Sequence, residues 1–194
     1  MAKAPPDYPI RSFESQAAWE AWLEEHHASA RGVWVRIAKA GASVATFSRA
    51  EALDSALCFG WIDGQARSFD EDTYLQKFTP RTKRSIWSKR NREHVERLIA
   101  AGRMRPAGLA AIEAAKADGR WDRAYDSPAT AAVPADLQAA LDAVPEAKAF
   151  FAALNSQNRY AILHRIQTAV KPETRARRIE KFVDMLRRGE KIYA

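Results

Sequence analysis

The stretch CFGWIDGQARSFDEDTYLQKFTPRTKRSIWSKRN (58–91) decides the fold of this 194-residue chain. It contains two extended runs, 61–69 and 73–78, separated by an acidic turn at 70–72. Two such runs around a short polar turn are typical of a β-hairpin. Beyond Pro80 the apolar residues recur with helical spacing. We therefore expect the sheet to lie before residue 80 and helices to follow it.

The residues before the hairpin predict two helices and two further strands. Ser15 is a candidate N-cap for a first helix that continues to about Glu25. Residues 33–38 (VWVRIA) alternate as a strand does, and 43–47 predict a second strand. The segment Ser-Arg-Ala-Glu at 48–51 is a capping box that begins a second helix.

The residues after the hairpin predict helices only. Ser88 can cap a helix that ends before Gly102, with Val95, Leu98 and Ile99 facing inward. Later helices are marked by Pro at 106, 134, 145 and 172 and by a cap at Asn155. Residues 120–133 form the longest irregular stretch between them.

Together these patterns predict an α+β protein. Its N-terminal half holds a small antiparallel β-sheet with two helices, and its C-terminal half is all helical. We expect a flexible tail over residues 1–12, an α+β part over 13–80 and a helical part over 81–194. A chain of this length forms one domain or two small ones, and we expect one compact unit.

The composition limits the compartment and the partners. The first residues contain no apolar segment of a secretory signal, and no stretch of the sequence has the roughly 20 apolar residues of a membrane helix, so we expect a cytoplasmic protein. A single cysteine, Cys58, excludes an internal disulfide and a cysteine-rich metal site. The net charge of +7 favours anionic partners, although a basic surface also occurs in proteins without such a partner.

Aromatic rings, a carboxylate outside the acidic turn (Asp63) and several cations crowd together only in the stretch 58–91, where we place the candidate ligand-binding site. Two arginines can form bidentate bonds to an anionic small molecule, and a tryptophan offers a face for stacking. The amides at the start of the helix after Ser88 add hydrogen-bond donors. The predicted site consists of Trp61, Asp63, Arg81, Arg84, Ser85, Trp87, Ser88 and Asn91.

Three other interpretations of the stretch stay open. In an enzyme, Asp63 would be the catalytic residue, acting as general acid or base in the same cleft. In a structural role, Asp63 pairs with Arg81 or Arg84 and joins sheet to helices, with the tryptophans in the core. The third is a binding site for nucleic acid or an anionic membrane surface on the basic helices, for which no recognition module is present.

Known catalytic and cofactor motifs are absent from the sequence. It has no phosphate-binding loop, no dinucleotide glycine pattern, no zinc-protease motif and no nucleophile elbow, so we expect no cofactor and no metal. Two histidines, His94 and His164, lie in predicted helices where they can face a cleft.

Positive charge is concentrated in two segments. Residues 77–105 contain ten Lys or Arg against two Glu. Near the C-terminus a second basic group consists of Arg165, Lys171, Arg175, Arg177 and Arg178. If the two segments face each other, they form a positive cleft.

The sequence resembles the YdeI/OmpD-associated family. The resemblance lies in CFGWIDG and FTPRTKRSIWSKRN, in AAGRMRPAGLAAIEAAKADGRW (100–121), and in ILHRIQTAVKPETRARRIEKFVDMLRRGEK (162–191). The last run is similar to the bacteriocin-protection (OmdA) domain, expected over about 134–191. The resemblance implies a bacterial, non-enzymatic protein linked to resistance against cationic antimicrobial peptides and to association with a porin as protein partner. It implies no catalytic residues, and a periplasmic location has been suggested for some members.

Overall fold

A computed structural model describes residues 7–42 and 47–194 of the chain. The chain divides into two compact units rather than one. The N-terminal unit contains Asn91–Asp122 together with the described residues up to Ile86, and the C-terminal unit contains Trp87–Arg90 and Arg123–Ala194. The division therefore differs from the boundary expected at residue 80, because most of the first two helices after the hairpin belongs with the sheet.

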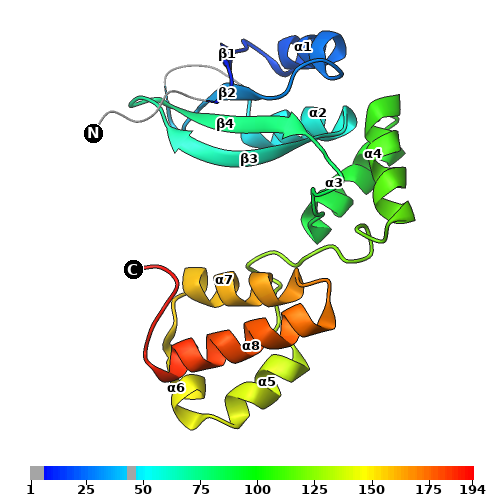
Figure 1. Cartoon of the computed structure of the whole chain (residues 1–194). Helices are drawn as coiled ribbons and strands as arrows, with labels where there is room; N and C mark the ends of the chain where they lie inside the picture. The colour runs from blue at the N-terminus through cyan, green and yellow to red at the C-terminus, as the bar shows by residue number, and fades with distance from the viewer. Residues whose placement is uncertain (1–6, 43–46) are drawn as a thin grey trace. The chain divides into compact units, whose positions relative to one another are not determined.

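A four-stranded sheet organises the N-terminal unit (Figure 1). Its strands are β1 (Ile10–Ser12), β2 (Val33–Ala38), β3 (Trp61–Ser68) and β4 (Thr73–Pro80), in the order β1-β2-β4-β3. The first pair is parallel, whereas the other two pairs are antiparallel. The sheet is therefore mixed, and the expectation of a purely antiparallel sheet is wrong.

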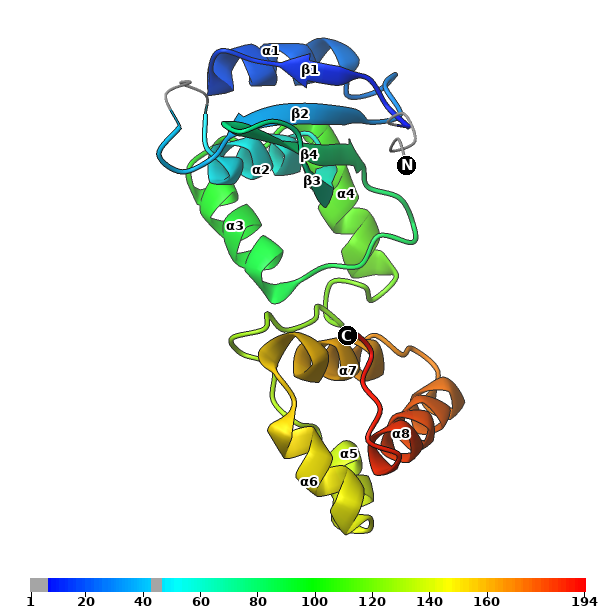
Figure 2. The same ribbon diagram turned by 90° about the vertical axis from the view of Figure 1, so that its left-hand side faces the viewer.

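The parallel strand β1 lies within the residues expected to be a tail. Ile10 is paired with Trp34 of β2, and Figure 2 shows β1 alongside β2 below helix α1 (Gln16–His26). Parallel neighbours need a crossover connection, and α1 supplies it. All three residues of β1 are exposed, so no apolar alternation marks this strand in the sequence.

The predicted hairpin is confirmed as β3 and β4. One carboxylate oxygen of Asp70 closes the turn, because it accepts bonds from the amides of Asp72 and Thr73 and from the Thr73 hydroxyl. The register shifts between Asp63 and Ala66, which places an irregularity in β3 next to the candidate carboxylate.

The predicted helices of the N-terminal unit are present as α1, α2 (Arg49–Cys58), α3 (Lys89–Ala100) and α4 (Pro106–Ala117). The capping box at the start of α2 is formed by Ser48 and Glu51 as predicted. The strand expected over 43–47 falls on residues 43–46, which lie outside the described ranges. Burial in α3 differs from the prediction at Ile99, which is 47% exposed.

The core of the N-terminal unit joins two helices to the sheet. Trp19 of α1 donates its indole N–H to the carbonyl of Ala52 in α2 at 3.1 Å, and its ring lies 5.5 Å from that of Phe78 in β4. Helix α4 approaches the end of α2 closely, since a Cβ on Gly108 would lie 2.2 Å from the carbonyl oxygen of Cys58. Only glycine permits this approach of two backbones.

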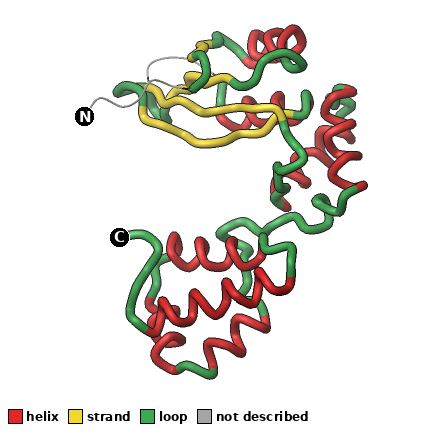
Figure 3. Tube along the Cα trace, viewed as in Figure 1, coloured by secondary structure: helices red, strands yellow, loops and turns green. Residues whose placement is uncertain are grey.

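Four helices build the C-terminal unit: α5 (Ala135–Asp142), α6 (Pro145–Ala153), α7 (Ser156–Gln167) and α8 (Pro172–Arg187). Figure 3 shows helices and loops only in this unit, as the sequence predicts. The expected cap at Asn155 is confirmed, because its side chain accepts from the amide of Asn158. The core packs apolar residues of all four helices together, including Leu137, Leu141, Phe151, Ile162, Ile166, Phe182 and Leu186.

The predicted irregular stretch 120–133 supplies a short pairing within the C-terminal unit. Ser88 and Tyr125 form an isolated parallel bridge. The amide of Lys89 donates to the carbonyl of Tyr125, and the amide of Tyr125 donates to the carbonyl of Trp87, both at 2.9 Å. The residues that begin α3 are therefore held by a segment about 35 positions away in the chain.

Across the described ranges, no helix has the length and apolar content needed to cross a membrane. The same residues include no group of three or more His, Cys, Asp or Glu placed to hold a metal ion.

Candidate functional site

Both tryptophans of the predicted site are buried, and Trp61 is a core residue of the N-terminal unit. It is 1% exposed, and its indole N–H donates to the carbonyl of His27 at 3.1 Å. Its ring meets that of Trp22 edge to face, with 5.8 Å between the ring centroids. Trp61 therefore tethers the start of β3 to the end of α1.

The carboxylate of the predicted site, Asp63, forms an ion pair with Arg49 of α2. One oxygen of Asp63 lies 2.6 Å from the guanidinium, and the Asp63 side chain is 16% exposed. A structural pair for this carboxylate is among the interpretations of the sequence, but the partner comes from the helix before the hairpin and not from the cations after it.

The cations of the predicted site lie in the loop that follows β4. The amide of Arg81 donates to the carbonyl of Gly60, and its guanidinium donates to the carbonyl of Ile86. Arg84 is exposed. The hydroxyl of Ser85 accepts from the amide of Thr82 at 2.9 Å, which closes a turn inside the loop.

The predicted site residues are divided between the two units. Trp87 and Ser88 belong to the C-terminal unit, whereas Asn91, which is 9% exposed, belongs to the N-terminal unit with Trp61 and Asp63. A ligand site formed by all eight residues therefore stays a prediction.

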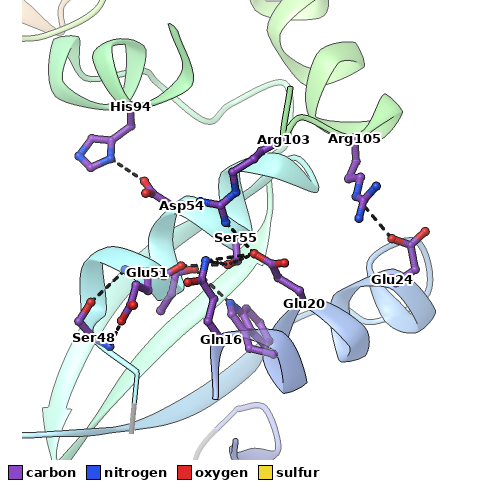
Figure 4. A network of polar contacts seen from close by, with 12 residues as sticks. Gln16, Glu20, Glu24, Ser48, Glu51, Asp54, Ser55, His94, Arg103 and Arg105 are labelled. Carbon is purple, nitrogen blue, oxygen red and sulfur yellow. Dashed lines mark hydrogen bonds and ion pairs between the residues drawn. The ribbon is translucent and has the colours of Figure 1, made fainter. Parts of the chain in front are cut away.

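A polar network that the sequence did not reveal connects α2 with α3. One oxygen of Asp54 lies 2.7 Å from Nδ1 of His94, and the other lies 2.6 Å from the guanidinium of Arg97. Burial alone would raise the pKa of Asp54, but the hydrogen bonds from Arg97 and His94 outweigh it and hold the pKa below its usual range. Figure 4 shows His94 pointing toward Asp54 across the two helices.

A second part of the network connects α1, α2 and the residues after α3. Glu20 accepts bonds from Gln16, from the Ser55 hydroxyl and, at 2.7 Å, from the guanidinium of Arg103 (Figure 4). Ser55 is fully buried, so these bonds satisfy polar groups inside the unit. The network couples helices to one another.

A cavity of about 670 Å³ in the C-terminal unit combines cations, aromatic rings and an imidazole. Its size is in the range of small-molecule sites. Three residues at helical spacing contribute to its wall, namely Tyr160 and His164 of α7 and Thr168, which caps the end of that helix. The full lining consists of these and Pro128, Ser156, Gln157, Ala161, Arg165, Arg178 and Tyr193. We call this cavity the α7–α8 pocket.

The imidazole of His164 is the chemically adaptable group of the α7–α8 pocket. Its ring contacts those of Tyr125 and Tyr160, with centroid distances of 4.7 and 5.7 Å. Neither ring nitrogen forms a hydrogen bond with the part of the chain that the structure describes. Burial lowers the pKa of His164, and the charges of Arg165 and Arg178 lower it further. The free pocket therefore holds a neutral imidazole at neutral pH.

Two guanidiniums of the pocket have no carboxylate partner within the described ranges. Arg165 donates to the carbonyl of Ala161 at 3.0 Å and lies 3.5 Å from the hydroxyl of Tyr193. Arg178 of α8 donates to the carbonyl of Arg165. An arginine has five N–H donors, so both retain donors for a ligand.

The wall of the pocket behind Tyr160 is rigidly bonded. The hydroxyl of Tyr160 donates to the carbonyl of Asp126 at 2.9 Å. The carboxylate of Asp126 is taken up by Lys89 at 2.6 Å and by Gln167 at 2.7 Å. The carboxylate of Asp126 is therefore already neutralised, and the lining of the pocket itself contains arginines and no carboxylate.

A larger and more apolar groove of about 840 Å³ lies between α5 and α8 of the same unit. Ala140, Ile179 and Val183 contribute to its lining. Its two arginines are bound by aspartates, Arg175 by Asp136 and Arg187 by Asp184, and Glu180 adds a further carboxylate. Its lining is mostly apolar and its arginines are already bound by carboxylates, so the α7–α8 pocket is the better candidate for a small-molecule anion site.

Three residues of the α7–α8 pocket stand out in the sequence, but no local pattern shows that they line one cavity. His164 lies in a predicted helix where it can face a cleft, and Arg165 and Arg178 belong to the basic segment near the C-terminus. Tyr193 was not predicted to belong to a site. Two hydrogen bonds between its backbone amide and carbonyl and the side chain of Asn158 hold it beside α7. The four-residue spacing of Tyr160, His164 and Thr168 was the signal available.

The fold and the pocket define an α+β chain that joins a sheet-containing unit to a helical unit with a cationic cavity. Residues 11–111 match a family model described as Domain of unknown function (DUF8412). Residues 130–189 match the model described as Bacteriocin-protection, YdeI or OmpD-Associated (OmdA), as the resemblance predicted. The chain belongs to the first family, which covers more than half of it, and carries the second as its C-terminal domain. Searches of the curated proteins and of the solved structures each find no match to it.

Proposed function

We propose that this protein is a binding protein for a small organic anion and that the α7–α8 pocket holds the ligand. One observation carries the proposal: a single cavity is lined by tyrosine rings, two guanidiniums and an imidazole, and among the described residues the guanidiniums have no carboxylate partner and the imidazole ring has no hydrogen bond. Elsewhere in the C-terminal unit the arginines Arg175, Arg187 and Arg188 bind aspartates. Unpaired donors in a cavity favour an anionic guest.

The pocket therefore replaces the junction of sheet and helices as the proposed anion site. Its match to the OmdA model extends over all of α7 and α8. A role in bacteriocin protection would then be indirect, because the net charge of +7 repels cationic peptides.

A structural role for the two arginines is the alternative to a ligand site. Arg178 donates to the carbonyl of Arg165 in the last turn of α7, where a cation stabilises a helix end, and Arg165 donates to the carbonyl of Ala161 one turn earlier. That role predicts a loss of stability in Arg178→Gln and no effect on any ligand.

The test is a thermal-shift screen of the full chain at pH 7 against aromatic carboxylates, aryl phosphates, their neutral amides and a short single-stranded RNA. Hits are measured by calorimetry with wild type, Arg178→Gln and Arg165→Gln. Loss of a charge-assisted bond should weaken an anion by about 10- to 100-fold.

Arg177→Gln is the matched control, because Arg177 is exposed on the same helix and does not line the pocket. It removes the same charge and should leave affinity within about twofold. Anions that bind equally well to the pocket variants would disprove the site. Binding of RNA alone, with a steep salt dependence, would favour the nucleic-acid alternative.

A further inference from the structure

We propose that the ligand carries two negative charges on a planar body and that its binding places a proton on His164. The inference rests on the proposed function of the α7–α8 pocket and adds its ligand class and its response to pH. The candidate ligands share a doubly negative charge, which either a phosphate monoester or a pair of carboxylates can supply.

The charge of the pocket sets the charge of the guest. Arg165 and Arg178 bring two positive charges, and the residues that line the cavity include no carboxylate. Asp126, behind Tyr160, is bound by Lys89 and Gln167. A monoanion leaves one guanidinium charge uncompensated in a half-buried site, whereas a dianion compensates both.

Proton uptake follows from what surrounds the imidazole. The groups that face His164 are Tyr125 from the irregular stretch, Tyr160 and Arg165 from α7, Arg178 from α8 and Tyr193 from the C-terminal segment. None of them is an anion at neutral pH. A bound dianion offsets the two guanidinium charges that lower the pKa of His164, and an anionic oxygen gives its free N–H a partner.

The walls of the pocket favour a planar body. The rings of Tyr160 and Tyr193, with Pro128 and Ala161, provide apolar surface next to the cations. Arg165 already lies 5.9 Å from the ring centroid of Tyr193, so a cation and an aromatic face are presented together. A planar ring that bears acidic groups can contact the apolar walls with its faces and the arginines with its acidic groups.

The experiment compares isophthalate, benzoate and phenyl phosphate by calorimetry with the full chain. The two carboxylate probes keep constant charge between pH 5.5 and 8, because carboxyl groups titrate near 4. We expect isophthalate to bind more tightly as the pH falls, approaching tenfold per pH unit where one proton is taken up. Buffers of different ionisation enthalpy count that proton directly.

His164→Gln provides the decisive variant, since glutamine keeps a donor and an acceptor but cannot be protonated. It should abolish the increase in isophthalate affinity with falling pH and the uptake of a proton on binding. Phenyl phosphate, measured at pH 7.5 where its second ionisation is complete, distinguishes a phosphate ligand from a dicarboxylate.

Each outcome decides between the two proposals. Binding of isophthalate without proton uptake, a slope unchanged in His164→Gln, or equal affinity for benzoate would overturn this inference and leave the anion site intact. If none of the three probes binds wild type at millimolar concentration, both the inference and the anion site are overturned.

Discussion

The two units use their charged and aromatic side chains differently. In the N-terminal unit, Asp54 is paired with Arg97, Glu20 with Arg103, and Asp63 with Arg49. In the α7–α8 pocket of the C-terminal unit, Arg165 and Arg178 have no such partner within the described ranges. The many charged residues of the N-terminal unit named above therefore bind one another and stabilise the fold. The two arginines of the α7–α8 pocket remain available to bind a ligand.

The aromatic residues follow the same contrast. The indoles of Trp19 and Trp22 stack with 5.4 Å between centroids, and Trp61 meets Trp22 edge to face. These rings form a core. Tyr160 and Tyr193 instead line a cavity. A tryptophan beside a carboxylate in sequence is thus weaker evidence for a site than a tyrosine and a histidine one helical turn apart.

The largest expected effect is on the framework. Trp61→Ala should lower the free energy of unfolding by about 3–5 kcal/mol, because it removes a fully buried ring from the core. Urea unfolding followed by tryptophan fluorescence measures it, since five of the six tryptophans lie in the N-terminal unit.

Trp61→Phe is its matched control. It keeps an aromatic ring but removes the indole N–H that donates to the carbonyl of His27. The free energy of unfolding should therefore fall by about 1–2 kcal/mol. A folded Trp61→Ala protein with wild-type stability and weakened binding of isophthalate would show that Trp61 belongs to the ligand site after all.

The second effect concerns the carboxylate that joins α2 and α3. Asp54→Asn should destabilise the protein by about 1–3 kcal/mol at pH 7, because it weakens two hydrogen bonds with a buried charge. The folded-state pKa of Asp54 is lowered, so its contribution is complete above the unfolded value near 4 and is lost as the pH falls through the folded value.

The difference between Asp54→Asn and wild type should therefore shrink below about pH 4, measured by urea unfolding at each pH. Glu93→Gln is the control, because Glu93 is exposed on α3 and should change the stability by less than about 0.5 kcal/mol. A difference that stays constant down to pH 2 would show that the charge of Asp54 contributes nothing.

Local signals predicted much of the fold. The capping box at Ser48, the cap at Asn155 and the proline-started helices follow from residues within one helical turn of each other, and the hairpin follows from two extended runs joined by a short turn. Strand β1 did not, because its three exposed residues have no local pattern and gain their conformation from pairing with Trp34. Ile99 was misplaced because helical spacing alone does not say which neighbour covers a face.

The candidate site was harder to predict because its partners are distant in sequence. Asp54 and His94 are 40 positions apart, and Tyr193 lies beside α7 from 35 positions beyond Asn158. Proximity in sequence suggested Arg81 or Arg84 for Asp63, whereas the fold supplies Arg49. The basic composition indicated an anionic ligand, but only the folded structure shows which arginines form no ion pair with a carboxylate of the described residues.

The smallest expected effect separates the two proposed anion sites most sharply. Arg84→Ala removes an exposed cation of the predicted site, so stability should change by less than about 0.5 kcal/mol and the affinity for isophthalate by less than about twofold. Arg165→Ala removes an equal charge from the pocket and should weaken isophthalate by at least about tenfold. Both variants lower the net charge equally, so long-range attraction cancels in the comparison. Were Arg84→Ala the one that lost the ligand in calorimetry, the anion would belong to the loop after β4, and the unpaired arginines of α7 and α8 would serve only the helix ends.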